Sequence, residues 1–272
     1  MKTNIPRAAS TARISCIICA FNEAPRISAV LAVAWAHPLL HEVIIVDDGS
    51  TDETTEIVKR YPTVKLISYP VNQGKSFAMA TGVAAASSDL LMLLDADLSG
   101  LAGNQITALA TPVLSGKTDV SISLRQNSLW VYRLIGLDFV SGERVIRRDL
   151  LSGALQEILV LPHFGIEVFM NRAIIDRRLS ISVAHWPQVT QARKTEKLGY
   201  WKGMRAEWHM IADLLQVAYP FLLISQTYHL LSLRAKHVGS QESSVRIVKP
   251  RYSAYWNAAC GQFLRLARVV RR

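Results

Sequence analysis

The sequence predicts an α/β fold of the doubly wound type, with a mainly parallel sheet and a C-terminal helical appendage. Over the first 123 residues, short apolar runs alternate with helical patterns. The runs are continuous in Ile, Val and Leu, which is typical of strands that helices cover on both faces. Half of the 272 residues are apolar, enough for a sizeable core, and this content excludes intrinsic disorder.

Each element follows from these patterns in order. The expected strands are 14–20, 42–46, 64–68, 90–94 and 120–124, and the expected helices are 24–36, 52–61, 76–86 and 104–114. Beyond residue 124 the pattern loosens, and we expect a helix within 137–155, another over 165–176 and a short strand over 179–184. We therefore divide the chain into a sheet domain (12–184), a basic loop (185–203) and a basic helical appendage (204–272).

Charge and cysteine content suggest partners and a compartment. The net charge is +10; residues 1–136 are neutral and residues 137–272 carry the whole excess. Such a basic half suggests an anionic partner, namely phosphates, a lipid surface or nucleic acid. The three cysteines cannot form a disulfide framework, and the pair Cys16 and Cys19 is expected to be buried in a strand. We expect a cytoplasmic protein, because no signal peptide is evident.

The appendage has two features that bear on membranes. The apolar stretch 211–233 is interrupted by polar residues, so it predicts one or two buried or interfacial helices instead of a spanning helix. The tail 252–272 alternates apolar residues with arginines. This pattern fits a helix on an anionic membrane, and it fits an ordinary amphipathic helix with a solvated basic face equally well.

Carboxylates follow two of the expected strands. Asp47 and Asp48 end the second strand, and Asp95 and Asp97 end the fourth in a D-x-D pattern. The carboxyl ends of parallel strands share one edge of a sheet, so these groups should converge there. Paired carboxylates suit Mg²⁺ or Mn²⁺, which would neutralise a departing diphosphate. The alternatives are a surface Asp pair at 95 and 97 and a purely turn-shaping role at 47 and 48.

A third signal is the turn Asn72-Gln73-Gly74-Lys75, which opens a helix. Its backbone N–H groups and the Lys75 ammonium form a natural anion site. The sequence lacks the glycine-rich phosphate-binding patterns of dinucleotide-dependent dehydrogenases and P-loop NTPases, so both classes are disfavoured.

In this order and spacing, the motifs resemble family 2 glycosyltransferases of the GT-A fold over residues 12–170. They are most similar to the dolichol-phosphate mannosyltransferase and glucosyl-phosphoglycerate synthase-like branches, which share the N-E motif of residues 22–23 and the N-x-G-K motif of residues 72–75. Ser99 departs from the Gln that polyprenyl-phosphate transferases often carry there. The resemblance makes residues 12–184 a catalytic domain that binds a nucleotide sugar.

The resemblance also implies roles for single residues. Ala20, Phe21 and Glu23 would line the nucleoside pocket, Asp48 would contact the base, Lys75 the diphosphate, Asp95 the ribose or the metal, and Asp97 the metal. Arg144 is a candidate for holding an acceptor phosphate, or it lies on a solvated helix face. Glu167 is a candidate general base or an ordinary helix-start residue, and His185 is a candidate third metal ligand or a structural histidine. Lys202 lies in the basic run 193–203, which suits a lid or a solvated loop.

These observations favour a metal-dependent glycosyltransferase that uses a UDP- or GDP-sugar, Mg²⁺ or Mn²⁺, and an anionic acceptor bearing a phosphate or a lipid, with peripheral contact to an anionic membrane. A sugar-1-phosphate nucleotidyltransferase and an inactive donor-binding homologue remain alternatives. A nucleic-acid-binding protein is also an alternative, but we expect no nucleic acid because exposed interleaved aromatic residues are missing.

Overall fold

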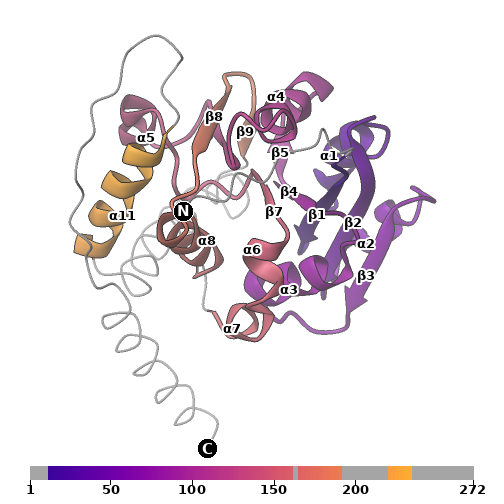
Figure 1. Cartoon of the computed structure of the whole chain (residues 1–272). Coiled ribbons are helices and arrows are strands. Elements are labelled where there is room, and N and C mark those ends of the chain that lie inside the picture. The colour runs from indigo at the N-terminus through magenta and orange to yellow at the C-terminus, as the bar shows by residue number, and fades with distance from the viewer. Residues whose placement is uncertain (1–11, 162–164, 192–219, 235–272) are drawn as a thin grey trace, which may run out of the picture. The chain divides into compact units, whose positions relative to one another are not determined.

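The computed structural model describes residues 12–161, 165–191 and 220–234. Its centre is a seven-stranded mixed sheet with the strand order β3-β2-β1-β4-β7-β6-β8 (Figure 1). Strands β3, β2, β1 and β4 are parallel, β7 is antiparallel to both of its neighbours, and β8 is parallel to β6. The strands are β1 (Ile14–Ala20), β2 (Leu40–Asp48), β3 (Lys65–Tyr69), β4 (Leu90–Asp95), β6 (Val120–Arg125), β7 (Arg144–Arg147) and β8 (Ile181–Trp186). A separate antiparallel pair joins β5 (Leu98–Ser99) to β9 (Thr190–Gln191).

Two layers of helices cover the sheet. One layer holds α1 (Ile27–Ala34), α2 (Thr54–Val58) and α4 (Gly103–Leu114). The other holds α3 (Lys75–Ala85), α6 (Asp149–Ser152), α7 (Leu155–Leu159) and α8 (Gly165–Asp176), which gather together in Figure 1. Helix α11 (Pro220–Leu233) packs on α8, and the short α5 (Trp130–Ile135) follows β6.

The core between sheet and helices explains the apolar runs. Alternate residues of β1, such as Ile14 and Ile18, pack against α1 and α4 in one continuous cluster of buried side chains. Cys16 belongs to this cluster, and Cys19 is half-buried, so the C-x-x-C pair lies within a strand as expected. Burial raises the pKa of Cys19 to about 12, which keeps its thiol protonated at neutral pH.

The predicted α/β class with a mainly parallel sheet is confirmed. All six expected strands and the helix over 165–176 are present, with ends shifted by two residues at most. Strand β7 was missed, because its four residues Arg-Val-Ile-Arg carry too short an apolar signal and lie inside a region predicted as helix. The predicted helical stretch 211–233 contains α11. The first part of that stretch belongs to residues 192–219, which lie outside the described residues, as does the tail 252–272.

Within the described ranges, no helix combines the length and the apolar character that crossing a bilayer requires.

Candidate functional site

The loops after β1 and β2 are tied together at one edge of the sheet. The backbone N–H of Asn22 donates to Ser50 Oγ at 2.9 Å, and the Asn22 side-chain oxygen accepts from the Thr51 N–H at 2.8 Å. Beside this link, Ala20 is buried and Glu23 pairs with Arg26 at 3.2 Å. Phe21, predicted with them for the nucleoside pocket, is 44% exposed, so its ring presents an apolar face at this edge.

Asp48 holds the turn that begins α3. Its two carboxylate oxygens accept the backbone N–H groups of Gln73 and Gly74 at 2.8 and 2.7 Å. Asp47 accepts the N–H of Ser50 at 3.1 Å and also bonds the Thr55 hydroxyl. Both aspartates are buried. Asp47 and Asp48 therefore both shape turns, as the alternative interpretation expected. Contact between Asp48 and the base of a nucleotide stays a prediction.

Lys75 lies between two carboxylates from different elements. Its Nζ is 3.0 Å from Asp95 Oδ1, at the end of β4, and 2.9 Å from Glu167 Oε1, in the first turn of α8. Partial burial lowers the pKa of Lys75, but attraction by Asp95 and Glu167 outweighs it and holds the pKa well above its ordinary value. The side chain is still 36% exposed, so this permanent cation can reach an incoming anion.

Asp95 is also held from the opposite side. Its Oδ2 accepts a hydrogen bond from Gln191 Nε2 at 3.0 Å and lies 3.8 Å from Arg125 Nη1. The Cα of Gly142 packs against the same carboxylate: a Cβ there would lie 2.8 Å from Oδ1 and 2.9 Å from Oδ2. Only glycine therefore fits beside Asp95 in this arrangement.

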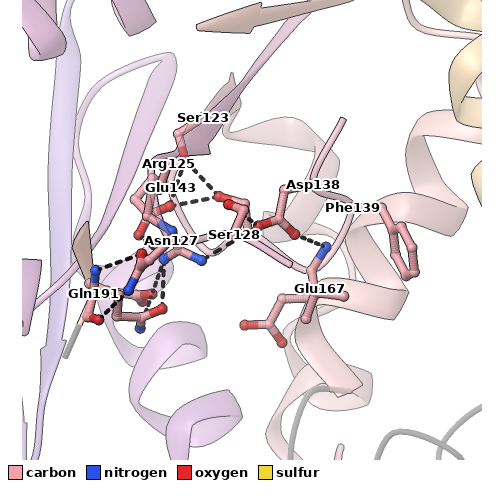
Figure 2. Close-up of polar contacts among 12 residues, drawn as sticks. Ser123, Arg125, Asn127, Ser128, Asp138, Phe139, Glu143, Glu167 and Gln191 are labelled. Atoms are coloured by element: carbon pink, nitrogen blue, oxygen red, sulfur yellow. Dashed lines mark hydrogen bonds and ion pairs between the residues drawn. The ribbon is translucent and has the colours of Figure 1, made fainter. Parts of the chain in front are cut away.

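Arg125 is the centre of a buried polar network. Figure 2 shows it beside Glu143, with Gln191 and Asn127 on one side and Ser128 and Asp138 on the other. Its Nη1 donates to Glu143 Oε1 at 2.7 Å, and its Nη2 lies 3.6 Å from Asp138 Oδ2. Burial lowers the pKa of Arg125, but Glu143, Asp95 and Asp138 outweigh that effect and raise it. Burial also raises the pKa of Glu143 despite the attraction of Arg125.

A divalent cation fits the charges and ligand types at this edge. Carboxylates outnumber the nearby cations Lys75, Arg125 and Arg144; they belong to Asp95, Asp97, Asp138, Glu143 and Glu167. Mg²⁺ and Mn²⁺ accept one or two carboxylates and complete their coordination with water and phosphate oxygens. Asp95 ends β4 and Asp97 lies two residues further along the chain, so both lie at the edge where such a cation would bind.

His185 does not join the predicted metal ligands. His185 lies on β8, where it pairs with Leu124 of β6. Strand β8 is three strand positions from β4, about 14 Å at the usual strand spacing. Because neighbouring residues of a strand point to opposite faces, His185 points away from the face that Arg125 uses. Among the residues that the structure describes, no three His, Cys, Asp or Glu side chains cluster as a metal site. The structure therefore corrects the metal-ligand prediction for His185.

Arg144 is corrected as well. It is fully buried, and its guanidinium donates to the carbonyls of Ser141 and Phe139 at 2.8 Å each and to Asn171 Oδ1 at 2.7 Å. Burial lowers its pKa to about 10. Because the buried guanidinium donates to these internal oxygen atoms, it links β7 to α8 and presents no surface to the phosphate of a substrate. Lys202, predicted for substrate contact, lies outside the described residues.

Several residues of the site were missed by the sequence analysis. The sequence predicted no role for Arg125, Asn127, Gly142 or Gln191. Arg125 carried a usable signal, because it is a charged residue directly after a buried strand. Asn127 and Gln191 carried none, since these two bonded residues lie 64 residues apart in the chain.

Comparisons with known proteins point in one direction. The model of the family "Glycosyl transferase family 2" matches residues 15–154, just over half of the chain. A dolichyl-phosphate beta-glucosyltransferase (ALG5A) of Trichomonas vaginalis is 43% identical over 60 residues, 21% of this chain and 19% of that protein. A poly-beta-1,6-N-acetyl-D-glucosamine synthase of Staphylococcus epidermidis is 35% identical over 91 residues, 31% of this chain and 21% of that protein.

A solved structure covers more of the fold. Glucosyl-3-phosphoglycerate synthase of Mycobacterium tuberculosis, in complex with Mn²⁺, UDP and glucosyl-3-phosphoglycerate, superposes with a TM-score of 0.58 at 24% identity, over 76% of this chain and 80% of that one. This likeness confirms the GT-A fold. The matches to the curated relatives named above span only about a fifth of the length of each. Because the family model matches just over half of the chain and the fold agrees with it, the chain belongs to glycosyl transferase family 2.

Proposed function

We propose that the chain is a glycosyltransferase that moves a sugar from a UDP- or GDP-linked donor, with Mg²⁺ or Mn²⁺, to an acceptor that bears a phosphate or a lipid. The observation that carries the proposal is the placement of Lys75. The turn that Asp48 braces holds this cation between Asp95 and Glu167, where the two sides of a transfer reaction would meet.

On the donor side, the chain supplies contacts for each part of a nucleotide sugar. The exposed Phe21 ring and the tied loops after β1 and β2 offer a surface for the nucleoside. Lys75 binds the diphosphate and stabilises its charge as the bond to the sugar breaks. Asp95 and Asp97 would hold the divalent cation, which when bound supplies further charge neutralisation on the diphosphate.

On the acceptor side, Glu167 is the candidate general base. Its side chain is only 3% exposed, and its Oε2 has no hydrogen-bond partner among the described residues. When Lys75 turns to the diphosphate, the other oxygen loses its partner as well, and the carboxylate can take the proton of an acceptor hydroxyl. An acceptor that reacts through an ionised phosphate would need no base.

The relatives support both sides of the proposal. The Mycobacterium tuberculosis enzyme has been solved with Mn²⁺, UDP-glucose and glycerol 3-phosphate, a phosphate-bearing molecule. The Trichomonas vaginalis protein and a human relative are both named dolichyl-phosphate beta-glucosyltransferases. The proposed acceptor classes, a small phosphate ester and a lipid phosphate, are the ones these names contain.

Thermal unfolding with added ligands tests the proposal. A ligand that binds the folded state raises the unfolding midpoint. We expect UDP or GDP, and one of their sugar conjugates, to raise it more with Mn²⁺ than with EDTA. Absence of a shift with every UDP- and GDP-sugar would contradict the proposed donor.

Gly142→Ala should lower turnover about tenfold or more with little loss of stability. The new methyl group would overlap the Asp95 carboxylate and displace it from the diphosphate, and small misplacements cost rates of this order. Steady-state kinetics checks this result, with Gly153→Ala as the matched control, because a Cβ at Gly153 would meet nothing within 4 Å. Equal turnover of Gly142→Ala and Gly153→Ala would contradict the role of this contact.

Helix α5 supports contact with an anionic lipid surface. Trp130 and Leu134 are 75% and 77% exposed, and with Val131 they occupy about 100° of the helix circumference. Tyr132, on the other side, stacks edge-on against Phe139. Two cations lie close to this helix: Arg133, which is exposed, and Arg234, whose guanidinium lies at the C-terminal cap Gly136. Exposed Trp and Leu beside cations are typical of helices that lie on anionic membranes.

Sedimentation with phosphatidylglycerol-containing vesicles tests this surface. Trp130→Glu with Leu134→Glu should shift most of the protein from the vesicle pellet to the supernatant, because two carboxylates oppose both burial and charge attraction. Val160→Glu, at an exposed apolar position after α7, is the control and should sediment like wild type. Unchanged sedimentation of the double variant would contradict contact between α5 and the lipid surface. The membrane role predicted for 252–272 lies outside the described residues.

A further inference from the structure

The geometry points to a positioning role for Gln191 and Asn127, two residues with no role in the predicted site. We propose that Asn127 fixes the backbone of Gln191, and that the Gln191 amide then sets the orientation of the Asp95 carboxylate for the donor-bound metal. The inference rests on the proposed function, because Asp95 matters only if this edge binds a nucleotide diphosphate with a divalent cation.

The side-chain amide of Gln191 bridges groups of opposite charge. Its oxygen Oε1 accepts from Arg125 Nη1 at 2.6 Å, and its nitrogen Nε2 donates to Asp95 Oδ2 at 3.0 Å. A guanidinium only donates and a carboxylate only accepts, so the amide can satisfy both partners in one orientation alone. Arg125 is itself fixed by Glu143 at 2.7 Å. The orientation of Asp95 is therefore set by a chain of partners that begins in the buried core.

Asn127 holds Gln191 through its main chain. The Asn127 Nδ2 donates to the Gln191 carbonyl at 2.7 Å, and the Gln191 N–H donates to Asn127 Oδ1 at 3.1 Å. This reciprocal pair lies next to a backbone bond from the Gln126 N–H to the Val189 carbonyl at 3.0 Å. Figure 2 shows Asn127 and Gln191 side by side. Together these bonds dock β9 onto the end of β6, and they bring the Gln191 side chain within hydrogen-bond distance of Asp95.

The result is a carboxylate held on three sides. Gln191 holds Oδ2, Lys75 holds Oδ1 at 3.0 Å, and Gly142 lies against both oxygens. Partners that orient a metal ligand in this way typically contribute 10- to 100-fold to metal affinity.

Calorimetric titration of the full chain with UDP and with GDP, each with Mn²⁺ and with EDTA, tests the proposal. Gln191→Ala should weaken Mn²⁺-dependent nucleotide binding about tenfold and leave binding in EDTA within twofold, because the amide acts only through Asp95. Asn127→Ala should weaken it in the same direction. The double variant should bind no more weakly than Gln191→Ala, since Asn127 acts through Gln191.

Controls and contrary outcomes separate this role from general damage. Gln188→Ala, an exposed amide in the same β8–β9 turn, should bind like wild type in both conditions. If Gln191→Ala binds the nucleotide as tightly as wild type does, the positioning role is wrong and the proposed function is untouched. Equal weakening of binding with Mn²⁺ and with EDTA would have the same meaning. Additive effects of the two substitutions would overturn the action of Asn127 through Gln191. A wild-type chain that binds neither nucleotide with Mn²⁺ would overturn the proposed function, and the positioning role with it.

Discussion

Lys75→Met is expected to reduce turnover about 100- to 1000-fold, the usual loss when one group that stabilises developing charge is removed. Methionine fills similar space but carries no charge, so the leaving diphosphate would lose its protein cation. Asp95 and Glu167 would also lose their shared partner, which stands 3.0 and 2.9 Å from them. Steady-state kinetics with the donor identified by thermal unfolding measures the loss.

A control variant and a stability measurement distinguish loss of the Lys75 charge from general damage to the protein. Lys59→Met removes a lysine from an exposed pair with Glu56 on α2 and should keep wild-type turnover. The unfolding midpoint of Lys75→Met should stay close to that of wild type, because the Lys75 side chain is partly solvated in the wild type. Turnover of Lys75→Met within threefold of wild type would exclude Lys75 from diphosphate binding.

Glu167→Gln is expected to lower kcat about 100-fold or more while donor affinity changes little, because general bases typically contribute factors of this size. Glutamine keeps the shape of the side chain and its contact with Lys75, but it cannot accept the acceptor proton. Measurement of kcat beside the Kd of the donor separates the two effects.

Glu157→Gln, an exposed glutamate on α7, is the matched control for Glu167→Gln. Wild-type kcat in the Glu167 variant would contradict the role of general base. That outcome would favour an acceptor that attacks through an ionised phosphate, where no proton needs to be removed.

The sheet and the donor edge were predictable from the sequence because both depend on local patterns. Continuous apolar runs mark β1, β2 and β4, and the carboxylates that end the strands follow them directly. The sequence also predicted that the turn before Lys75 opens a helix, and α3 begins at Lys75.

The remaining parts of the site depend on contacts that no local pattern encodes. Arginine is a residue type that often binds phosphate, but β7 places Arg144 in the core, where its N–H groups donate to backbone carbonyls. His185 follows a strand as a metal ligand would, yet the strand order puts three spacings between it and β4. Gln191 is 96 residues from Asp95 in the chain, and only the docking of β9 reveals their hydrogen bond.

We propose that Asp95 at the end of β4 and Asp97 just beyond it bind the metal and diphosphate of a nucleotide-sugar donor. Mn²⁺-dependent release of UDP or GDP from that donor, compared between wild type and Asp97→Ala, tests it most directly. Asp89→Ala, an exposed aspartate just before β4, is the matched control and should release nucleotide like wild type. We expect Asp97→Ala to abolish the release that depends on Mn²⁺, because the metal would lose one of its carboxylate ligands. Equal release by Asp97→Ala and wild type would contradict it.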